Sequence, residues 1–166
     1  MESPRKEQQR GRGILLTSPN YPLSPEMPRG IDDERSLVNL LWAKGFAVMR
    51  APASGAATKM PRPDIIAGKR AKGLQYAIEA KTTHEKVLYA EKESIDQLLL
   101  FADTFGCRPL LAVKFKGRKR TGLFLPPSAL SPTKGNNYRL SYDDALAHGM
   151  DLKTIAGEGR QSRLHP

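Results

Sequence analysis

The first sustained hydrophobic pattern along the chain has the period of a helix. Apolar residues recur three and four positions apart at Leu37, Val38, Leu40 and Leu41. Such a stripe occupies one helix face, and a glycine directly after it commonly marks a helix end. We therefore predict an amphipathic helix that begins at Asp32 and ends near Lys44 and Gly45.

Five short apolar runs that follow have the length and boundaries of β-strands. They occupy residues 46–49, 64–67, 74–81, 110–113 and 122–125. Segments rich in glycine, proline or charge separate them, as expected for strands joined by loops. Only residues 68–73 separate the second run from the third, so we expect these two to pair as a hairpin.

A second helical pattern runs from about Ala90 to Phe105 and is followed by Gly106. Its broad apolar face consists of Ile95, Leu98, Leu99, Ala102 and Phe105. We expect this face to cover the sheet. Leu100 and Phe101 widen the apolar surface further, which indicates either a deep core or a self-association surface.

The succession of elements predicts an α/β protein, in which helices flank a mixed sheet of about five strands. A length of 166 residues, 39% of them apolar, fits a single domain, which we assign to residues 31–157. Residues 1–30 carry five prolines and no sustained period, so we expect a flexible N-terminal arm. Residues 142–155 are expected to add a short helix, and residues 158–166 a loose C-terminal tail.

Three charged residues stand at the second and third apolar runs: Asp64, Glu79 and Lys81. Side chains two positions apart in a strand share a face, so Glu79 and Lys81 point away from the layer that receives Ile78 and Ala80. The hairpin would bring Asp64 beside Glu79. Two carboxylates suit a hard cation such as Mg²⁺, and a neighbouring ammonium can position water or offset charge on a phosphoryl group. The set predicts a metal-dependent site that hydrolyses nucleic-acid backbone.

Each fragment also has an ordinary structural interpretation. Glu-x-Lys on a strand is often a solvated face, and Pro-Asp often starts a turn. Together they favour a site, because Asp64 and Glu79 adjoin apolar runs where an unpaired carboxylate would be costly.

Glu34 lies on the same helical stripe as Leu37 and Leu41 and therefore faces inward. A single acid at a helix start is often only a capping or dipole feature. With Asp64 and Glu79 in the same domain, we favour a third acidic member of the metal site. Arg35 would then contact a backbone phosphate or hold that acid.

The chain is strongly basic, with 27 Lys and Arg against 17 Asp and Glu, a net charge of +10 and a pI near 9.9. A polyanionic partner is expected. Five cations lie within seven positions at the turn between the last two predicted strands: Lys114, Lys116, Arg118, Lys119 and Arg120. Arg50 precedes a segment of small residues in which Ser54 could donate to phosphate, although an ordinary flexible loop explains this segment as well.

Several classes of protein are excluded or disfavoured. One cysteine, Cys107, excludes an internal disulfide framework and fits a reducing cytosol. The three histidines are scattered and do not have the spacing of zinc ligands. The chain has no phosphate-binding loop, so we expect no nucleotide cofactor. No run approaches the length of a membrane span or the apolar core of a secretory signal. We expect a cytoplasmic protein without membrane association.

Several segments, in this order, resemble those of archaeal-type Holliday junction resolvases. They are Glu34-Arg35, Arg50, Ser54-Gly55, Pro63–Gly68, Ile78–Lys81, Leu88-Tyr89 and Leu111–Phe115. The resemblance covers residues 31–126 approximately. Resolvases of this kind belong to the restriction-endonuclease-like, PD-(D/E)xK superfamily. They are homodimers that use Mg²⁺ to introduce paired nicks in four-way DNA junctions.

The resemblance implies a role for individual positions. The implied metal ligands are Glu34, Asp64, Glu79 and the carbonyl of Ala80. Lys81 would be the catalytic lysine. The implied contacts near the scissile phosphate are Arg35, Arg50 and Ser54. Gln97 is similar to a glutamine that follows the catalytic lysine in many superfamily members, and Mn²⁺ is expected to substitute for Mg²⁺.

Two other functions stay open at the level of sequence. The Asp/Glu-x-Lys core alone also fits another PD-(D/E)xK nuclease, acting in restriction, repair or RNA processing. A non-catalytic DNA-binding module would share the basic charge. For a resolvase, we expect recognition of junction shape and phosphates rather than base edges.

Overall fold

The computed structural model describes residues 34–51, 60–118 and 122–158. Its helices are α1 (Glu34–Ala43), α2 (Lys92–Phe105), α3 (Tyr142–His148) and α4 (Leu152–Ile155), with 3-10 turns η1 (Arg70–Lys72) and η2 (Pro127–Ala129). Its strands are β1 (Ala47–Arg50), β2 (Ile65–Lys69), β3 (Leu74–Thr83), β4 (Val87–Ala90), β5 (Arg108–Phe115), β6 (Leu123–Leu125), β7 (Ser131–Pro132) and β8 (Tyr138–Ser141). The predicted N-terminal arm and nearly all of the predicted tail lie outside the described residues. Within those residues, no helix combines the length and the apolar composition that a membrane span needs.

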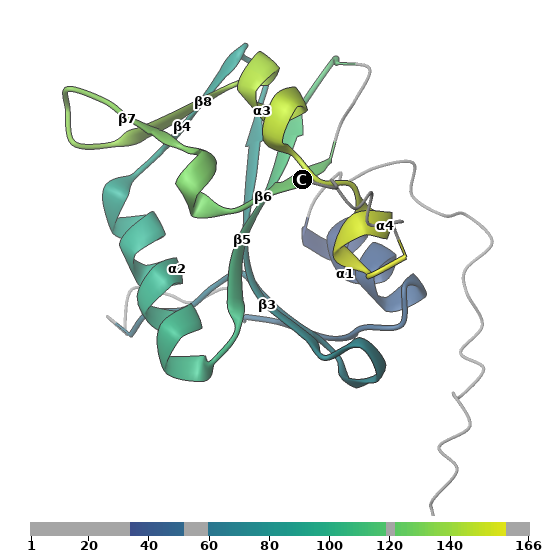
Figure 1. The fold of residues 1–166 in the computed structure, drawn as a ribbon. Coiled ribbons are helices and arrows are strands. Elements are labelled where there is room, and N and C mark those ends of the chain that lie inside the picture. The colour runs from purple at the N-terminus through teal and green to yellow at the C-terminus, as the bar shows by residue number, and fades with distance from the viewer. Residues whose placement is uncertain (1–33, 52–59, 119–121, 159–166) are drawn as a thin grey trace, which may run out of the picture.

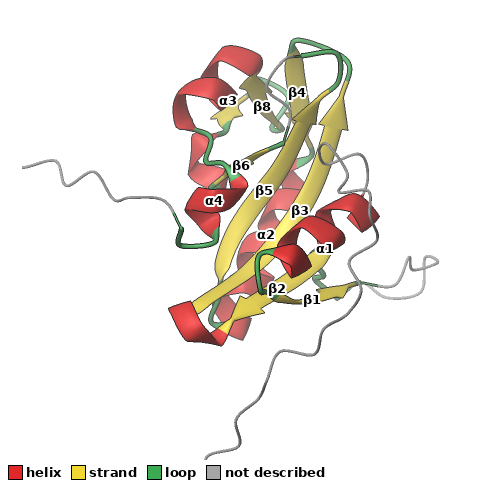
Figure 2. Cartoon of the chain, turned by 90° about the vertical axis from the view of Figure 1, so that its right-hand side faces the viewer, coloured by secondary structure: helices red, strands yellow, loops and turns green. Residues whose placement is uncertain are grey.

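Five strands form a mixed sheet in the order β1-β2-β3-β5-β6 (Figure 2). β3 and β5 run parallel, whereas the other neighbouring pairs are antiparallel. These are the five strands that the hydrophobic pattern predicts, and the predicted α/β class is confirmed. The β2–β3 hairpin closes through η1 and Gly73, whose φ of 62° would strain a residue with a side chain.

Helices cover both faces of this sheet, α1 and α4 on one and α2 on the other (Figure 1). The core beneath α1 and α4 includes Leu37, Leu41, Ile65, Ile78 and Ile155. The core beneath α2 includes Ala77, Ile95, Leu98, Leu111 and Val113. Successive residues of β3 and β5 therefore enter opposite cores, as the two-residue period of a strand requires.

A second sheet, of three strands in the order β4-β8-β7, was not predicted from the sequence. Leu88 and Tyr89 lie in β4 instead of leading directly into a helix, and α2 begins at Lys92, after the predicted Ala90. β4 has only four residues, and its antiparallel partner β8 lies about 50 positions further along the chain. A local pattern cannot identify such a pairing. Leu88 and the β8 residue Leu140 join the core beneath α2.

The apolar surface of α2 is divided between the core and solvent. Ile95, Leu98 and Ala102 are buried, but Leu99, Leu100 and Phe105 are 42%, 57% and 53% exposed. The predicted placement of Leu99 and Phe105 against the sheet is therefore wrong. The Phe105 ring stacks on Phe101, with centroids 5.5 Å apart, and Phe101 packs against the core.

The basic segment is arranged differently from the predicted turn. β5 extends to Phe115, so Lys114 belongs to a strand and is only 8% exposed. The turn begins at Lys116, which is exposed. The Arg118 guanidinium lies over the ring of Tyr142, 5.4 Å from its centroid. Lys119 and Arg120 fall outside the described residues.

Candidate active site

Asp64, directly before β2, is held by hydrogen bonds from β3 and from the residue that follows β1. Its carbonyl accepts a hydrogen bond from the Ala51 N–H at 2.8 Å. Its Oδ2 accepts one from the Ala80 N–H of β3 at 2.7 Å. Because Ile65 pairs with Ile78, the next positions along the ladder are Asp64 and Glu79. The structure thus brings together the two carboxylates that the hairpin pattern predicts to be neighbours.

Glu79 and Lys81 occupy the face of β3 that is turned toward α2. Ile78 and Ala80 pack on the α1 side, so the predicted alternation of side chains along this strand is confirmed. The Lys81 Nζ donates to Glu79 Oε1 at 2.8 Å. Glu79 is the more deeply placed of the two, at 12% exposure against 29% for Lys81. Their ion pair is therefore partly shielded from water, which strengthens it relative to a surface pair.

Ser94, in the first turn of α2, is a member of this site that the sequence analysis missed. Its Oγ donates to Glu79 Oε1 at 2.7 Å. Ser94 precedes the buried Leu98 by four positions, so it lies on the helix stripe that faces the sheet. A polar residue on that stripe was the available signal, but the sheet residue opposite it cannot be read from a helical period.

Glu34 and Arg50 approach from the α1 side of the sheet. Arg50 pairs with Ile65 across the β1–β2 ladder, and Ile65 belongs to the α1-side core. The Arg50 Nε lies 3.5 Å from Glu34 Oε2, and both side chains are more than a third exposed. The predicted inward direction of Glu34 is thus only partly realised, and a surface pair of this kind adds little stability.

The environment of Asp64 contains an excess of negative charge. The pKa of Asp64 is raised to about 6 from an ordinary value of 3.8, chiefly by burial and in smaller part by the charges of Glu79 and Glu34. The Ala80 N–H and the Lys81 ammonium act in the opposite direction without cancelling the effect. The dependence on Glu34 shows that this acid lies within electrostatic range of Asp64. A cation placed here would stabilise the ionised form.

The chemistry of the donors fits a hard divalent cation at Asp64 and Glu79, because such ions prefer carboxylate oxygens. The predicted three-acid set is nevertheless only partly assembled. Across residues 34–51, 60–118 and 122–158, no three His, Cys, Asp or Glu side chains form a ready-made metal-binding group. Instead, Glu34 pairs with Arg50, and Glu79 with Lys81.

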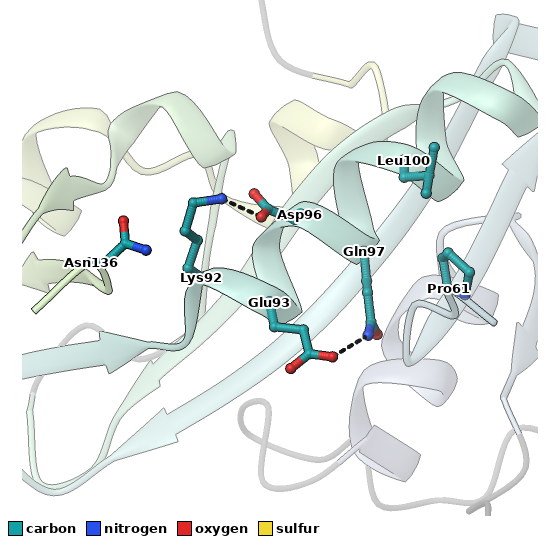
Figure 3. Close-up of a pocket in the computed structure, with 7 residues that line it drawn as sticks. All are labelled: Pro61, Lys92, Glu93, Asp96, Gln97, Leu100 and Asn136. Carbon is teal, nitrogen blue, oxygen red and sulfur yellow. Dashed lines mark hydrogen bonds and ion pairs between the residues drawn. The ribbon is translucent and has the colours of Figure 1, made fainter. Parts of the chain in front are cut away.

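A pocket of about 580 Å³ lies along the outer side of α2 (Figure 3). Its lining residues are Pro61, Lys92, Glu93, Asp96, Gln97, Leu100 and Asn136. Gln97, the glutamine implied by the resemblance, points toward Glu93 and donates to its Oε1 at 3.3 Å. Gln97 thus lies on the pocket side of the helix, whereas Ser94 lies on the side that contacts Glu79.

The remaining predicted DNA contacts are dispersed. Arg35 is exposed on α1, and Lys116 is exposed at the turn after β5. Arg50 also lines a smaller, mainly apolar pocket of about 210 Å³ together with Met49 and Phe101. Ser54 lies outside the described residues.

Comparison with known proteins gives a consistent result. A family model described as archaeal Holliday junction resolvase (Hjc) matches residues 26–164, which include every residue of the site. The chain belongs to this family. It is 36% identical to the crossover junction endodeoxyribonuclease Hjc of Methanocaldococcus jannaschii, over 82% of this chain and 92% of that protein.

Another Hjc relative and its structure extend this result. The Hjc of Archaeoglobus fulgidus is 34% identical over 82% of this chain and 95% of that protein. The solved structure of Archaeoglobus fulgidus Hjc, a Holliday junction resolvase, matches with a TM-score of 0.67 and 31% identity. The match covers 75% of this chain and 97% of the Archaeoglobus fulgidus chain. The Hjc fold therefore accounts for most of the described elements.

The raised pKa of Asp64 predicts a pH-dependent loss of stability in protein without metal. A carboxyl whose folded pKa exceeds its unfolded pKa favours the folded state fully below about pH 4, and this advantage is lost as the pH rises through about 6. Asp64→Asn keeps an acceptor for the Ala80 N–H and removes the charge. We expect it to raise the free energy of unfolding by roughly 1–2 kcal/mol at pH 8, but not at pH 4.

Urea denaturation in EDTA at both pH values measures this difference. Glu85→Gln, which removes an exposed carboxylate from the turn after β3, is the matched control and should leave stability nearly unchanged at both. An Asp64→Asn protein less stable than wild type at pH 8 would contradict the account.

Proposed function

We propose that this protein is a Mg²⁺-dependent endonuclease that resolves four-way DNA junctions by paired incision as a homodimer. The observation that carries the proposal is the convergence of Asp64, directly before β2, with Glu79 and Lys81 of the central strand β3, in a member of the Hjc family. Its relatives are named crossover junction endodeoxyribonucleases. Junction DNA is intracellular, so the proposal also assigns the protein to the interior of the cell.

The side chains have distinct roles in this proposal. Asp64 and Glu79 would hold the Mg²⁺ ion, with the Ala80 carbonyl and Glu34 as further ligands. When bound, the ion polarises a phosphoryl oxygen and makes a water molecule more acidic. The Ala80 N–H orients the Asp64 carboxylate through a bond to Oδ2. Mn²⁺, which has similar ligand preferences, substitutes for Mg²⁺.

Lys81 is the catalytic lysine. Its ammonium lies 2.8 Å from Glu79 Oε1 and is thus held beside a proposed ligand of the cation. There it positions the attacking water or offsets the negative charge that gathers on the phosphoryl oxygens, while the 3′ oxygen leaves. Arg50, which pairs with Glu34 at 3.5 Å, contacts the scissile phosphate in this proposal.

DNA is bound mainly through its phosphates, which the net charge of +10 favours. Arg35 and Lys116 are exposed and reach the phosphate backbone. Arg118, Ser54, Lys119 and Arg120 are proposed contacts on the basis of sequence. Lys114 is withdrawn from this set, because its side chain is buried in β5.

Paired incision requires two active sites, which a twofold dimer provides. The exposed apolar side chains of α2 offer the surface for it: Leu99, Leu100 and Phe105. The stacked Phe101 and Phe105 rings anchor this surface to the core. An apolar cluster of this kind on one helix is typical of a protein-protein interface.

Replacing the acid at the centre of the site should separate binding from cleavage. We expect Asp64→Asn to bind a four-way junction within about threefold of wild type in gel-shift assays, but to nick it at least about 100-fold more slowly with Mg²⁺. Binding survives because the variant removes a negative charge and no phosphate contact.

Glu85→Gln serves again as the control and should nick normally. Rapid nicking by Asp64→Asn would show that another group does the chemistry. A wild-type protein inert with both Mg²⁺ and Mn²⁺ would favour the non-catalytic DNA-binding alternative.

A charge on the outer face of α2 should dissociate the dimer. We expect Leu100→Glu to sediment as a monomer at concentrations where wild type is dimeric, and paired incision to decline with it. Trp42→Glu is the control, because Trp42 is 45% exposed on α1, on the opposite side of the sheet. Sedimentation velocity measures the oligomeric state of each variant. A wild-type protein that stays monomeric on junction DNA, or a Leu100→Glu protein that stays dimeric, would refute this surface.

A further inference from the structure

Two donors from different elements converge on one oxygen of Glu79. Lys81 Nζ lies 2.8 Å from Oε1, and Ser94 Oγ lies 2.7 Å from the same atom. All three side chains are partly buried. Lys81 shares a strand with Glu79, whereas Ser94 comes from α2.

The two donors restrain the carboxylate in different ways. Lys81 carries a full positive charge on a flexible four-carbon chain. It can therefore keep its ion pair with Glu79 in several rotamers of the Glu79 side chain, and it offsets the carboxylate charge in each of them. Ser94 has one short side-chain torsion and lies on a helix fixed by the buried Ile95 and Leu98. Its hydroxyl therefore defines a position for Oε1 and leaves the charge of Glu79 in place.

We propose that Ser94 is a positioning residue for the metal site. By holding Oε1 against α2, it keeps the other carboxylate oxygen of Glu79 available to a divalent cation beside Asp64. Without it, Lys81 alone holds Glu79, and ordering the carboxylate for the cation costs additional conformational entropy. This inference rests on the proposed function, since it concerns the cation of that same site.

A purely structural role makes a different prediction. Ser94 lies in the first helical turn, where a hydroxyl often satisfies backbone N–H groups, and Glu91, the N-cap of α2, makes no side-chain capping bond. If Ser94 served only the helix, its removal would lower stability without changing the affinity for Mg²⁺.

The test is calorimetric titration of DNA-free protein with Mg²⁺, together with the Mg²⁺ dependence of junction nicking. We expect Ser94→Ala to weaken Mg²⁺ binding about 3- to 10-fold and to raise by a similar factor the Mg²⁺ concentration for half-maximal nicking. Ser94→Thr, which retains the hydroxyl, should remain within about twofold of wild type.

Two further variants separate positioning from stability. Ser141→Ala removes the capping serine of α3, whose Oγ accepts from the Asp144 N–H at 3.0 Å, and should lower the melting temperature without changing Mg²⁺ affinity. In a Glu79→Gln background, Ser94→Ala should cause no further weakening of Mg²⁺ binding, because Ser94 acts through Glu79.

Unchanged Mg²⁺ affinity in Ser94→Ala, or an additive loss in the Glu79→Gln background, overturns the role of Ser94 while leaving the nuclease proposal intact. The proposed function can also fail while the role of Ser94 stands. A wild-type protein that binds Mg²⁺ but never nicks a junction overturns the proposed function, and the effect of Ser94 on the binding constant still stands. A wild-type protein that binds no Mg²⁺ overturns both.

Discussion

The pairing of β2 with β3 is the constraint on which the site depends. It aligns Ile65 with Ile78 and thereby places Asp64 beside Glu79, fifteen positions later in the chain. β3 then serves two purposes along alternate positions. Ile78 and Ala80 pack beneath α1, while Glu79 and Lys81 face α2. A shift of one residue in this pairing would exchange the two faces and bury the charged pair in the wrong layer.

The same arrangement has an energetic cost. Placing Asp64 in a half-buried position near Glu79 and Glu34 raises its pKa and disfavours its ionised form. The Ala80 N–H and the Lys81 ammonium relieve this only in part. A cation bound beside Asp64 would stabilise the ionised carboxylate and so offset this cost.

The main sheet could be predicted from the sequence because its strands are apolar runs bounded by turns, and because the β2–β3 hairpin is local. The second sheet could not, since β4 and β7 are short and β4 pairs with a strand far along the chain. Periodicity also misassigned Leu99 and Phe105, because a broad apolar helix face does not indicate which part meets the sheet. The placement of Lys114 was wrong because a basic residue next to a turn was assumed to be exposed.

The candidate site, too, could be predicted from the sequence only in part. Asp64, Glu79 and Lys81 follow from strand alternation and a hairpin, which are local properties. Ser94 required the packing of α2 on β3, a contact that no single element reveals. Glu34 was placed on the correct helix stripe, but its pairing with the exposed Arg50 depends on where β1 ends relative to α1.

The most direct test of the account maps incision on a four-way junction labelled in each of its four strands, with Mg²⁺ and an excess of unlabelled linear duplex. We expect symmetric nicks in two opposing strands, formed at equal rates and little affected by the duplex. Scattered nicks in single strands, or suppression by linear duplex as strong as that by unlabelled junction, would contradict this expectation.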